Sequence, residues 1–391
     1  MSNFIPYGKQ WLDKEEIEAV TKVLQSDWIT QGPKITEFEN KIADYCGADY
    51  AIAVSSGTAA LHIAALASGL SPGDEGITSP NTFLASSNCI AYCGGVPRFA
   101  DILPETFCIN PEELKKQITP KTRIVIPVHF AGQPCNMEAI SHSAKQNNLT
   151  VIEDAAHALG SQWIDKKGKC HKVGSCSHSH MTIFSFHPVK TITTGEGGMI
   201  LTNSKELAEK CRLLSNHGIT KDSSKFTNLQ PAICDLKSPP PWYYEMQRLG
   251  FNYRITDLQA ALGLVQLKRL PAFIKRRREI HKLYNKQLSG IGDLALPQEL
   301  SGRASCWHLY VLQTDSRDTL LKHLHDNNIG AHAMYIPVHL QPYYQDHYGY
   351  KKGDFPKSET YFQKSLILPL YPQMTNEMVD RVIDSVKAFY G

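Results

Sequence analysis

Residues 51–69 read AIAVSSGTAALHIAALASG, a short apolar run followed by a Ser-Ser-Gly-Thr turn and an alanine-rich stretch. The first part has the length and side chains of a buried strand, and the second has the composition of a helix that ends at Gly69. A buried strand that leads directly into a helix is the unit from which parallel sheets are built. This stretch therefore predicts an α/β fold.

The same alternation continues along the first two-thirds of the chain. Further runs with the character of buried strands lie at residues 96–101, 123–130, 149–156, 181–187 and 198–203. Helical patterns fall between most of them, near residues 83–93, 111–118 and 136–147. We expect a mostly parallel sheet that is covered by helices on both faces.

The pattern changes after His217. Residues 220–242 have no period and contain three consecutive prolines, and long irregular insertions of this kind are more often functional than not. A long helical pattern starts at Thr256, and Pro271 is expected to break it. The remainder indicates a smaller α+β unit, built from WHLYVLQT (307–314), a helix near 317–327, HAMYIPV (332–338) and a last helix near 375–389.

We therefore expect a large α/β domain over residues 1–250 and a small α+β domain over residues 251–391. Residues 1–12 are expected to pack near the small domain. The chain is long enough for this arrangement.

The charge balance excludes several classes of partner. Forty-one Lys and Arg against 38 Asp and Glu give a net charge of +3, so no global charge favours nucleic acid or a membrane surface. The first residues lack the apolar core of a signal peptide, and no apolar run approaches the roughly 18 residues of a membrane span. The ten cysteines are scattered, which indicates reduced thiols. We expect a cytoplasmic protein.

Polar residues suited to one ligand follow three of the predicted strands. Ser56-Gly57-Thr58 opens a helix, where hydroxyls and free backbone N–H groups make an anion site. Asp154 follows LTVIE (149–153) within the 149–156 run, and His157 comes three residues later. Ser185 lies near the end of the 181–187 run, and Lys190 follows that run. In an open α/β sheet, ligands bind beyond the carboxyl ends of the strands, so we expect these groups to meet.

An anion site, a carboxylate and an isolated lysine together indicate pyridoxal 5′-phosphate (PLP). The lysine would form the Schiff base, the carboxylate would pair with the ring nitrogen, and the hydroxyls would hold the phosphate. Lys190 stands in FSFHPVKTITTGEGG (184–198), whose glycines allow the backbone to pass close to the cofactor. Each feature alone has an ordinary structural explanation, and only their combination is specific.

Nearly the whole chain resembles the DegT/DnrJ/EryC1/StrS family of fold-type I, PLP-dependent sugar aminotransferases. The resemblance is carried by WITQGP (28–33), SSGTAALH (55–62), IEDAAHALGS (152–161), the lysine segment, GFNYRITDLQAALG (250–263) and YIPVHLQPYY (335–344). Within the family, IPYGKQ (5–10) and WYYEMQRLGFNYR (242–254) look most like the pseudaminic acid subgroup. The fold-type I architecture of this family implies a large domain built on a sheet of the seven-stranded type.

The resemblance also implies roles for individual residues. Catalysis would rest on Lys190, as Schiff base and proton shuttle, with Asp154 on the ring nitrogen and His157 beside the ring. The phosphate would be held by Gly57, Thr58 and Ser185. Phe83 would stack on the ring, and Asn252 would reach the phosphate of a neighbouring subunit in a homodimer with shared active sites. The sugar would lie among Tyr7, Thr30, His217 and Tyr335.

The activity implied is transfer of an amino group from glutamate to C4 of a UDP-4-keto-6-deoxy-N-acetylhexosamine. The nucleotide, the sugar stereochemistry and amination at C3 instead of C4 stay open. A PLP-dependent sugar deoxygenase would carry histidine in place of Lys190. A non-catalytic regulator that binds sugar nucleotide on the same fold is a further alternative.

Some residues admit other interpretations or depart from the family pattern. His180 stands where an aspartate is usual, and Met334 stands where a histidine is frequent, which bears on specificity. Phe83 could be a core aromatic, Asn252 a turn residue, and His217-Gly218 a helix end. The Cys and His residues of 170–180 resemble a metal cluster, but their spacing fits no common zinc knuckle, and we expect no metal site.

Overall fold

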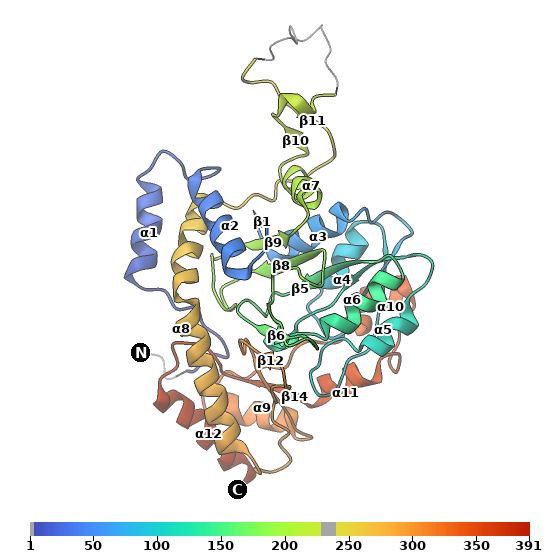
Figure 1. The fold of residues 1–391 in the computed structure, drawn as a ribbon. Coiled ribbons are helices and arrows are strands. Elements are labelled where there is room, and N and C mark those ends of the chain that lie inside the picture. The colour runs from blue at the N-terminus through green and yellow to red at the C-terminus, as the bar shows by residue number, and fades with distance from the viewer. Residues whose placement is uncertain (1–3, 228–239) are drawn as a thin grey trace.

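A seven-stranded sheet forms the centre of the molecule in the computed structural model, which describes residues 4–227 and 240–391 (Figure 1). Its order is β1-β9-β8-β5-β4-β2-β3. The strands are β1 (Tyr50–Val54), β2 (Glu75–Thr78), β3 (Val96–Phe99), β4 (Thr122–Ile126), β5 (Thr150–Asp154), β8 (Met181–Ser185) and β9 (Gly198–Thr202). β9 runs antiparallel to both of its neighbours, and the other pairs are parallel, so the expected mostly parallel sheet is confirmed.

Helices cover both faces of this sheet. Alternate residues of each strand point to opposite faces, so Ile152 and Val151 enter different apolar clusters. One face is covered by α3 (Gly57–Ala67), α4 (Ala85–Tyr92) and α7 (Lys205–Ser215). The other is covered by α2 (Pro33–Cys46), α5 (Pro111–Gln117), α6 (Met137–Gln146) and α8 (Asp257–Leu288). β2 is not predicted from the sequence, because its four residues EGIT contain a charge and a glycine.

The helix α8 runs for 32 residues, and the expected break at Pro271 is wrong. Thr256 starts the helix with a capping box to Gln259. Pro271 is exposed, while Leu270 and Phe273 beside it are buried in the core. Packing of the apolar face on both sides of the proline holds the helix together, although the ring removes one backbone hydrogen bond.

The C-terminal residues form a smaller layered unit beside the end of α8. Its core is formed by β13 (Tyr310–Gln313), α9 (Arg317–Asp326), β14 (Ser365–Leu368) and α12 (Asn376–Tyr390). Between α9 and β14, α10 (Pro342–Tyr348) packs against β3 and α4 of the large sheet layer, and α11 (Pro356–Lys364) follows it. Ile5 is buried in the core of the small unit and pairs with Ile329. Residues 332–338 form no strand, because only His332 makes a bridge, to Ile367, before the chain turns toward the sheet.

Three smaller features complete the described chain. β6 (Gln162–Ile164), β7 (Cys170–Lys172) and β12 (Arg303–Ala304) make a short sheet, and α1 (Lys14–Leu24) packs on α8. β10 (Ile219–Thr220) and β11 (Glu245–Met246) pair in an arm that stands away from the body (Figure 1). The irregular insertion predicted at 220–242 lies in this arm and partly outside the described residues. Within residues 4–227 and 240–391, no helix has the length and apolar character needed to cross a bilayer.

Candidate functional site

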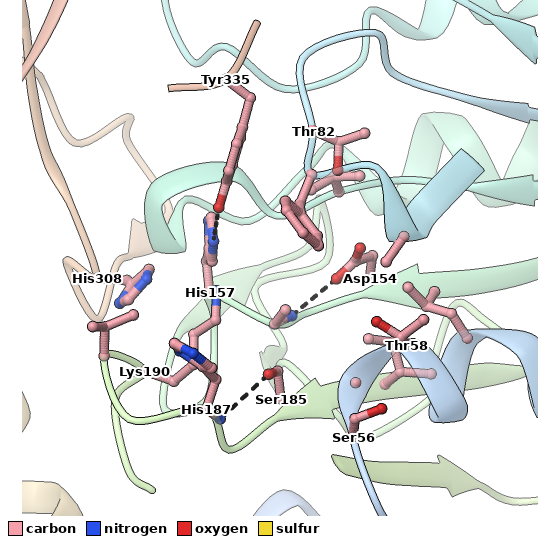
Figure 2. A pocket seen from close by; sticks show the side chains of 18 of the residues that line it. Ser56, Thr58, Thr82, Asp154, His157, Ser185, His187, Lys190, His308 and Tyr335 are labelled. Atoms are coloured by element: carbon pink, nitrogen blue, oxygen red, sulfur yellow. Dashed lines mark hydrogen bonds between the residues drawn. The ribbon is translucent and has the colours of Figure 1, made fainter. Parts of the chain in front are cut away.

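A cavity of about 420 Å³ opens at the carboxyl ends of the central strands (Figure 2). Asp154 is the last residue of β5 and Ser185 the last of β8, so the sheet itself sets their spacing. The cavity is lined by most of the residues that the sequence singles out, namely Tyr7, Gly57, Thr58, Phe83, Asp154, His157, Ser185, Lys190 and Tyr335. The predicted meeting of these groups is therefore present in one site.

Lys190 lies in the turn after β8, where its backbone N–H donates to the carbonyl of His187 at 2.9 Å. Burial lowers the pKa of its amine to about 8, and the charge of Asp154 opposes that shift. A lysine with a lowered pKa supplies a neutral amine near neutral pH, which is the nucleophilic form.

Asp154 is buried, with 5% of its surface exposed, and its carboxylate is held from two directions. The Ser86 hydroxyl donates to Oδ2 at 2.6 Å, and the backbone N–H of Ala156 donates to Oδ1 at 3.1 Å. Two hydrogen bonds from different segments fix the orientation of this carboxylate. Ser86 is not predicted from the sequence, where it is one of several hydroxyl residues in NTFLASSN (81–88).

The amino end of α3 faces the same cavity. Ser56 caps the helix by accepting the backbone N–H of Ala59 at 3.1 Å, which leaves the first N–H groups of the helix free for a ligand. At Gly57, a Cβ would lie 2.9 Å from the Cβ of Ser185. Only glycine lets the helix approach β8 this closely, and this approach gives the cavity an end suited to an anion.

His157 and Tyr335 form a hydrogen-bonded pair on the cavity wall (Figure 2). Burial, and then the charge of Lys190, lower the pKa of His157 well below its usual range. The backbone N–H of Ala131 donates to Nδ1 at 3.3 Å, so the proton of the neutral ring lies on Nε2. Nε2 lies 3.3 Å from the Tyr335 oxygen and donates to it, which leaves the Tyr335 hydroxyl hydrogen free to point at a ligand.

His308 is a cavity residue that the sequence analysis did not identify. Its ring lies 4.5 Å from that of His157, it is 4% exposed, and its Nδ1 has no hydrogen-bond partner among the described residues. Burial is the main cause that places its pKa well below the usual range. In the sequence it stands inside the strand-like run WHLYVLQT, where a histidine resembles a core residue.

Phe83 is 56% exposed, and its ring lies 5.8 Å from that of Tyr335, so its interpretation as a core aromatic is wrong. Met334 also lines the cavity. The departure from the family pattern at position 334 therefore bears directly on what the cavity accepts.

Three predicted residues lie outside this cavity. Thr30 is exposed and bridges to Thr256. His217 is exposed after α7, and the N–H of Gly218 bonds to the carbonyl of Leu213, so this pair does end the helix. The residue directly after the C-cap Asn216 is His217 and not Gly218, and both have a positive φ. Asn252 is exposed and pairs with Asn216 at the base of the arm. In this chain these three residues contribute nothing to the cavity wall.

The Cys and His residues of 170–180 have structural partners. His171 lies 2.9 Å from the carboxylate of Asp165 and stacks on Trp163. His180 accepts the N–H of Val151 at 3.0 Å and does not line the cavity. In the part of the chain that the structure describes, no group of three or more His, Cys, Asp or Glu is arranged to hold a metal ion.

Comparisons with known proteins identify the family and support the fold. The model of the DegT/DnrJ/EryC1/StrS aminotransferase family matches residues 10–387. The spore coat polysaccharide biosynthesis protein SpsC of Bacillus subtilis is 44% identical and aligns with 99% of this chain and 97% of its own. PseC of Helicobacter pylori, an aminotransferase involved in the biosynthesis of pseudoaminic acid, is 28% identical, with 99% of each chain covered and a TM-score of 0.88. The PLP form of Spr1654 from Streptococcus pneumoniae is 28% identical, with 98% of each chain covered and the same TM-score.

Proposed function

The chain belongs to the DegT/DnrJ/EryC1/StrS aminotransferase family, and from this premise we propose that it transfers an amino group from glutamate to C4 of a UDP-4-keto-6-deoxy-N-acetylhexosamine. The family consists of fold-type I, PLP-dependent sugar aminotransferases, and the chain is an enzyme of this kind. The observation that carries the proposal is the meeting of Lys190 and Asp154 in one cavity. The similarity to PseC supports the choice of sugar.

The residues of the cavity fit PLP. Lys190 offers an amine with a lowered pKa, Asp154 a buried carboxylate, and the first turn of α3 free backbone N–H groups beside Ser185. When bound, PLP supplies an electron sink for the electron pair left by removal of a proton from the carbon that bears the amine. We assign the phosphate to Gly57, Thr58 and Ser185.

Lys190 has two successive tasks in this proposal. It would hold the cofactor between reactions. Once the donor amine has displaced it, its neutral amine would take the proton from Cα of glutamate and deliver it to the cofactor, where the amino group stays when the 2-oxo acid leaves. In the second half-reaction the same amine would move a proton from the cofactor to C4 of the sugar, to which the amino group is transferred. Asp154 would accept a hydrogen bond from the ring nitrogen, and its negative charge would keep that nitrogen protonated.

The cavity wall supplies groups for the sugar. The Tyr335 hydroxyl, whose oxygen accepts a hydrogen bond from His157, is oriented to donate to a substrate oxygen, and Tyr7 also lines the cavity. We propose that Phe83 packs on one face of the cofactor ring.

Similarity to SpsC favours a second candidate, in which another 4-keto or 3-keto nucleotide sugar is the acceptor.

We infer that the working unit is a homodimer. Among the described lining residues of the cavity, Lys190 is the only lysine or arginine, whereas the cofactor phosphate, a nucleotide diphosphate and glutamate are all anionic. Thr30, His217 and Asn252 lie outside the cavity of their own chain and are available to a second one. The arm exposes large apolar side chains at Trp242, Tyr244, Met246 and Leu249, which suits burial against another subunit.

A mixing experiment tests the shared site. A Lys190→Ala chain and an Asn252→Ala chain are each expected to be defective alone. In a mixed dimer one pocket collects both defects and the other has neither, so activity should return. Persistent inactivity, after mass measurement has confirmed subunit exchange, would place both residues in the same chain's pocket.

The substrate is tested with the wild-type protein, glutamate and a panel of 4-keto and 3-keto nucleotide sugars. Turnover of the UDP-4-keto-6-deoxy-N-acetylhexosamine in preference to the others is the expected result. Turnover of a different sugar would support the second candidate. A sugar deoxygenase is disfavoured already, because the position that would be histidine is Lys190.

We also propose a cytoplasmic location, which the free state of all nine described cysteines supports.

A further inference from the structure

Two buried hydroxyl groups connect the cavity wall to the carboxylate of Asp154. The Thr82 and Ser86 oxygens lie 2.6 Å apart, and the Ser86 oxygen lies 2.6 Å from Oδ2 of Asp154. Thr82 is 2% exposed and Ser86 is fully buried. Thr82 lines the cavity and Ser86 lies behind it, in the first turn of α4.

The chemistry of the three groups fixes the direction of both hydrogen bonds. An ionised carboxylate only accepts, so the single hydroxyl hydrogen of Ser86 is donated to Asp154. The alternative acceptor for that hydrogen, the carbonyl of Phe83, lies 3.4 Å away. Because the Ser86 hydrogen is committed, the Ser86 oxygen accepts, and Thr82 donates. Successive hydroxyl donors polarise one another, which strengthens the bond that reaches the charge.

We propose that Ser86 is a positioning residue for this reaction and that Thr82 supports it. Together they hold the Asp154 carboxylate in an orientation that leaves one oxygen available to the cofactor ring nitrogen. The inference rests on the proposed function, since it assigns the ring nitrogen to Asp154. Ser86 acts only through that carboxylate, because it does not line the cavity itself.

The matched control is the neighbouring serine. Ser87 is also buried in α4, but its oxygen accepts the hydroxyl of Tyr344 at 2.7 Å and makes no contact with Asp154. Ser86→Ala and Ser87→Ala therefore impose the same change on the same helix, and only the first removes a donor from Asp154.

The experiment uses the PLP-loaded dimer, with PLP labelled with 15N at the ring nitrogen. Wild-type protein must first bind PLP and turn over its substrates. Failure at this step would count against the proposed function and not against the role proposed for Ser86 and Thr82. The ring-nitrogen NMR signal of Ser86→Ala should then move toward the unprotonated position, and kcat should fall on the order of tenfold. Ser87→Ala should match the wild type in its ring-nitrogen signal.

The Asp154→Asn background separates positioning from a general structural role. If Ser86 acts through the charged carboxylate, adding Ser86→Ala to Asp154→Asn should change kcat by less than about twofold. A loss of the same size in both backgrounds would overturn the proposal. So would a Ser86→Ala protein whose ring-nitrogen signal equals that of Ser87→Ala.

Thr82 provides a second test in case Ser86→Ala does not fold. Thr82→Val keeps the shape of the side chain and removes the donor, whereas Thr82→Ser keeps the donor. Thr82→Val should shift the ring-nitrogen signal in the same direction by a smaller amount, and Thr82→Ser should not. Identical ring-nitrogen signals in Thr82→Val and Thr82→Ser would overturn the role proposed for the two hydroxyl groups.

Discussion

Lys190 should capture PLP at neutral pH much faster than a lysine in water, because only the neutral amine attacks the aldehyde. Burial lowers its pKa from 10.5 to about 8. At pH 7.5, a group with a pKa of 8 is neutral in about one molecule in four, and one with a pKa of 10.5 in about one in a thousand. The structure therefore predicts a neutral fraction that is about 200-fold larger than for an ordinary lysine.

The assay mixes the cofactor-free chain with PLP and follows the visible Schiff-base band from about pH 6 to about pH 10.5, a range that spans both pKa values. The capture rate should rise about tenfold per pH unit at first and then flatten above pH 8. Nα-acetyl-lysine in the same buffers reports the ordinary amine and corrects for the titration of PLP itself.

Asp154→Asn makes this test more specific, because burial lowers the pKa of Lys190 while the charge of Asp154 raises it. Removing the charge should move the midpoint of the rate profile to lower pH, whatever happens to the absolute rate. A profile that flattens only near pH 10.5, or a midpoint that rises in Asp154→Asn, would refute the account of Lys190 as an amine controlled by burial.

Three further variants test other parts of the structure. Gly57→Ala should weaken PLP binding by at least about tenfold in an equilibrium titration, because its Cβ would lie 2.9 Å from the Cβ of Ser185; unchanged affinity would show that the close approach is not needed. Pro271→Ala should raise the free energy of unfolding by about 1–3 kcal/mol in urea, since the helix continues through this exposed position; a loss of stability would contradict that. Arg277→Met should lower the same quantity by about 2 kcal/mol or more, because the buried guanidinium donates to three backbone carbonyls; near-wild-type stability would mean that the carbonyls find other donors.

The chemistry of the site is readable in the sequence because it depends on local order. Each of these groups lies within a few residues of the element that positions it. Asp154 ends β5, Ser185 ends β8 with Lys190 five residues later, and Gly57 is the first residue of α3. Parallel strands bring their carboxyl ends to one edge, so residues at those ends meet without any knowledge of long-range packing.

Packing decided what local patterns do not encode. β2 is a strand because two parallel neighbours supply its hydrogen bonds, although EGIT has no strand signature. α8 continues through Pro271 because its buried residues on either side are held by the core. In both places tertiary contacts outweigh a local preference of a few kcal/mol.

The remaining site residues were decided by contacts between distant segments. Ser86 lies 68 positions from Asp154, and His308, which comes just before β13, contacts His157. In the sequence, Ser86 is one serine among several, and His308 looks like part of a core strand. The sequence determined which groups stand at the strand ends, because that depends on neighbours along the chain. Only the tertiary structure decided which other side chains surround them, because hydrogen bonds and burial depend on distance in space.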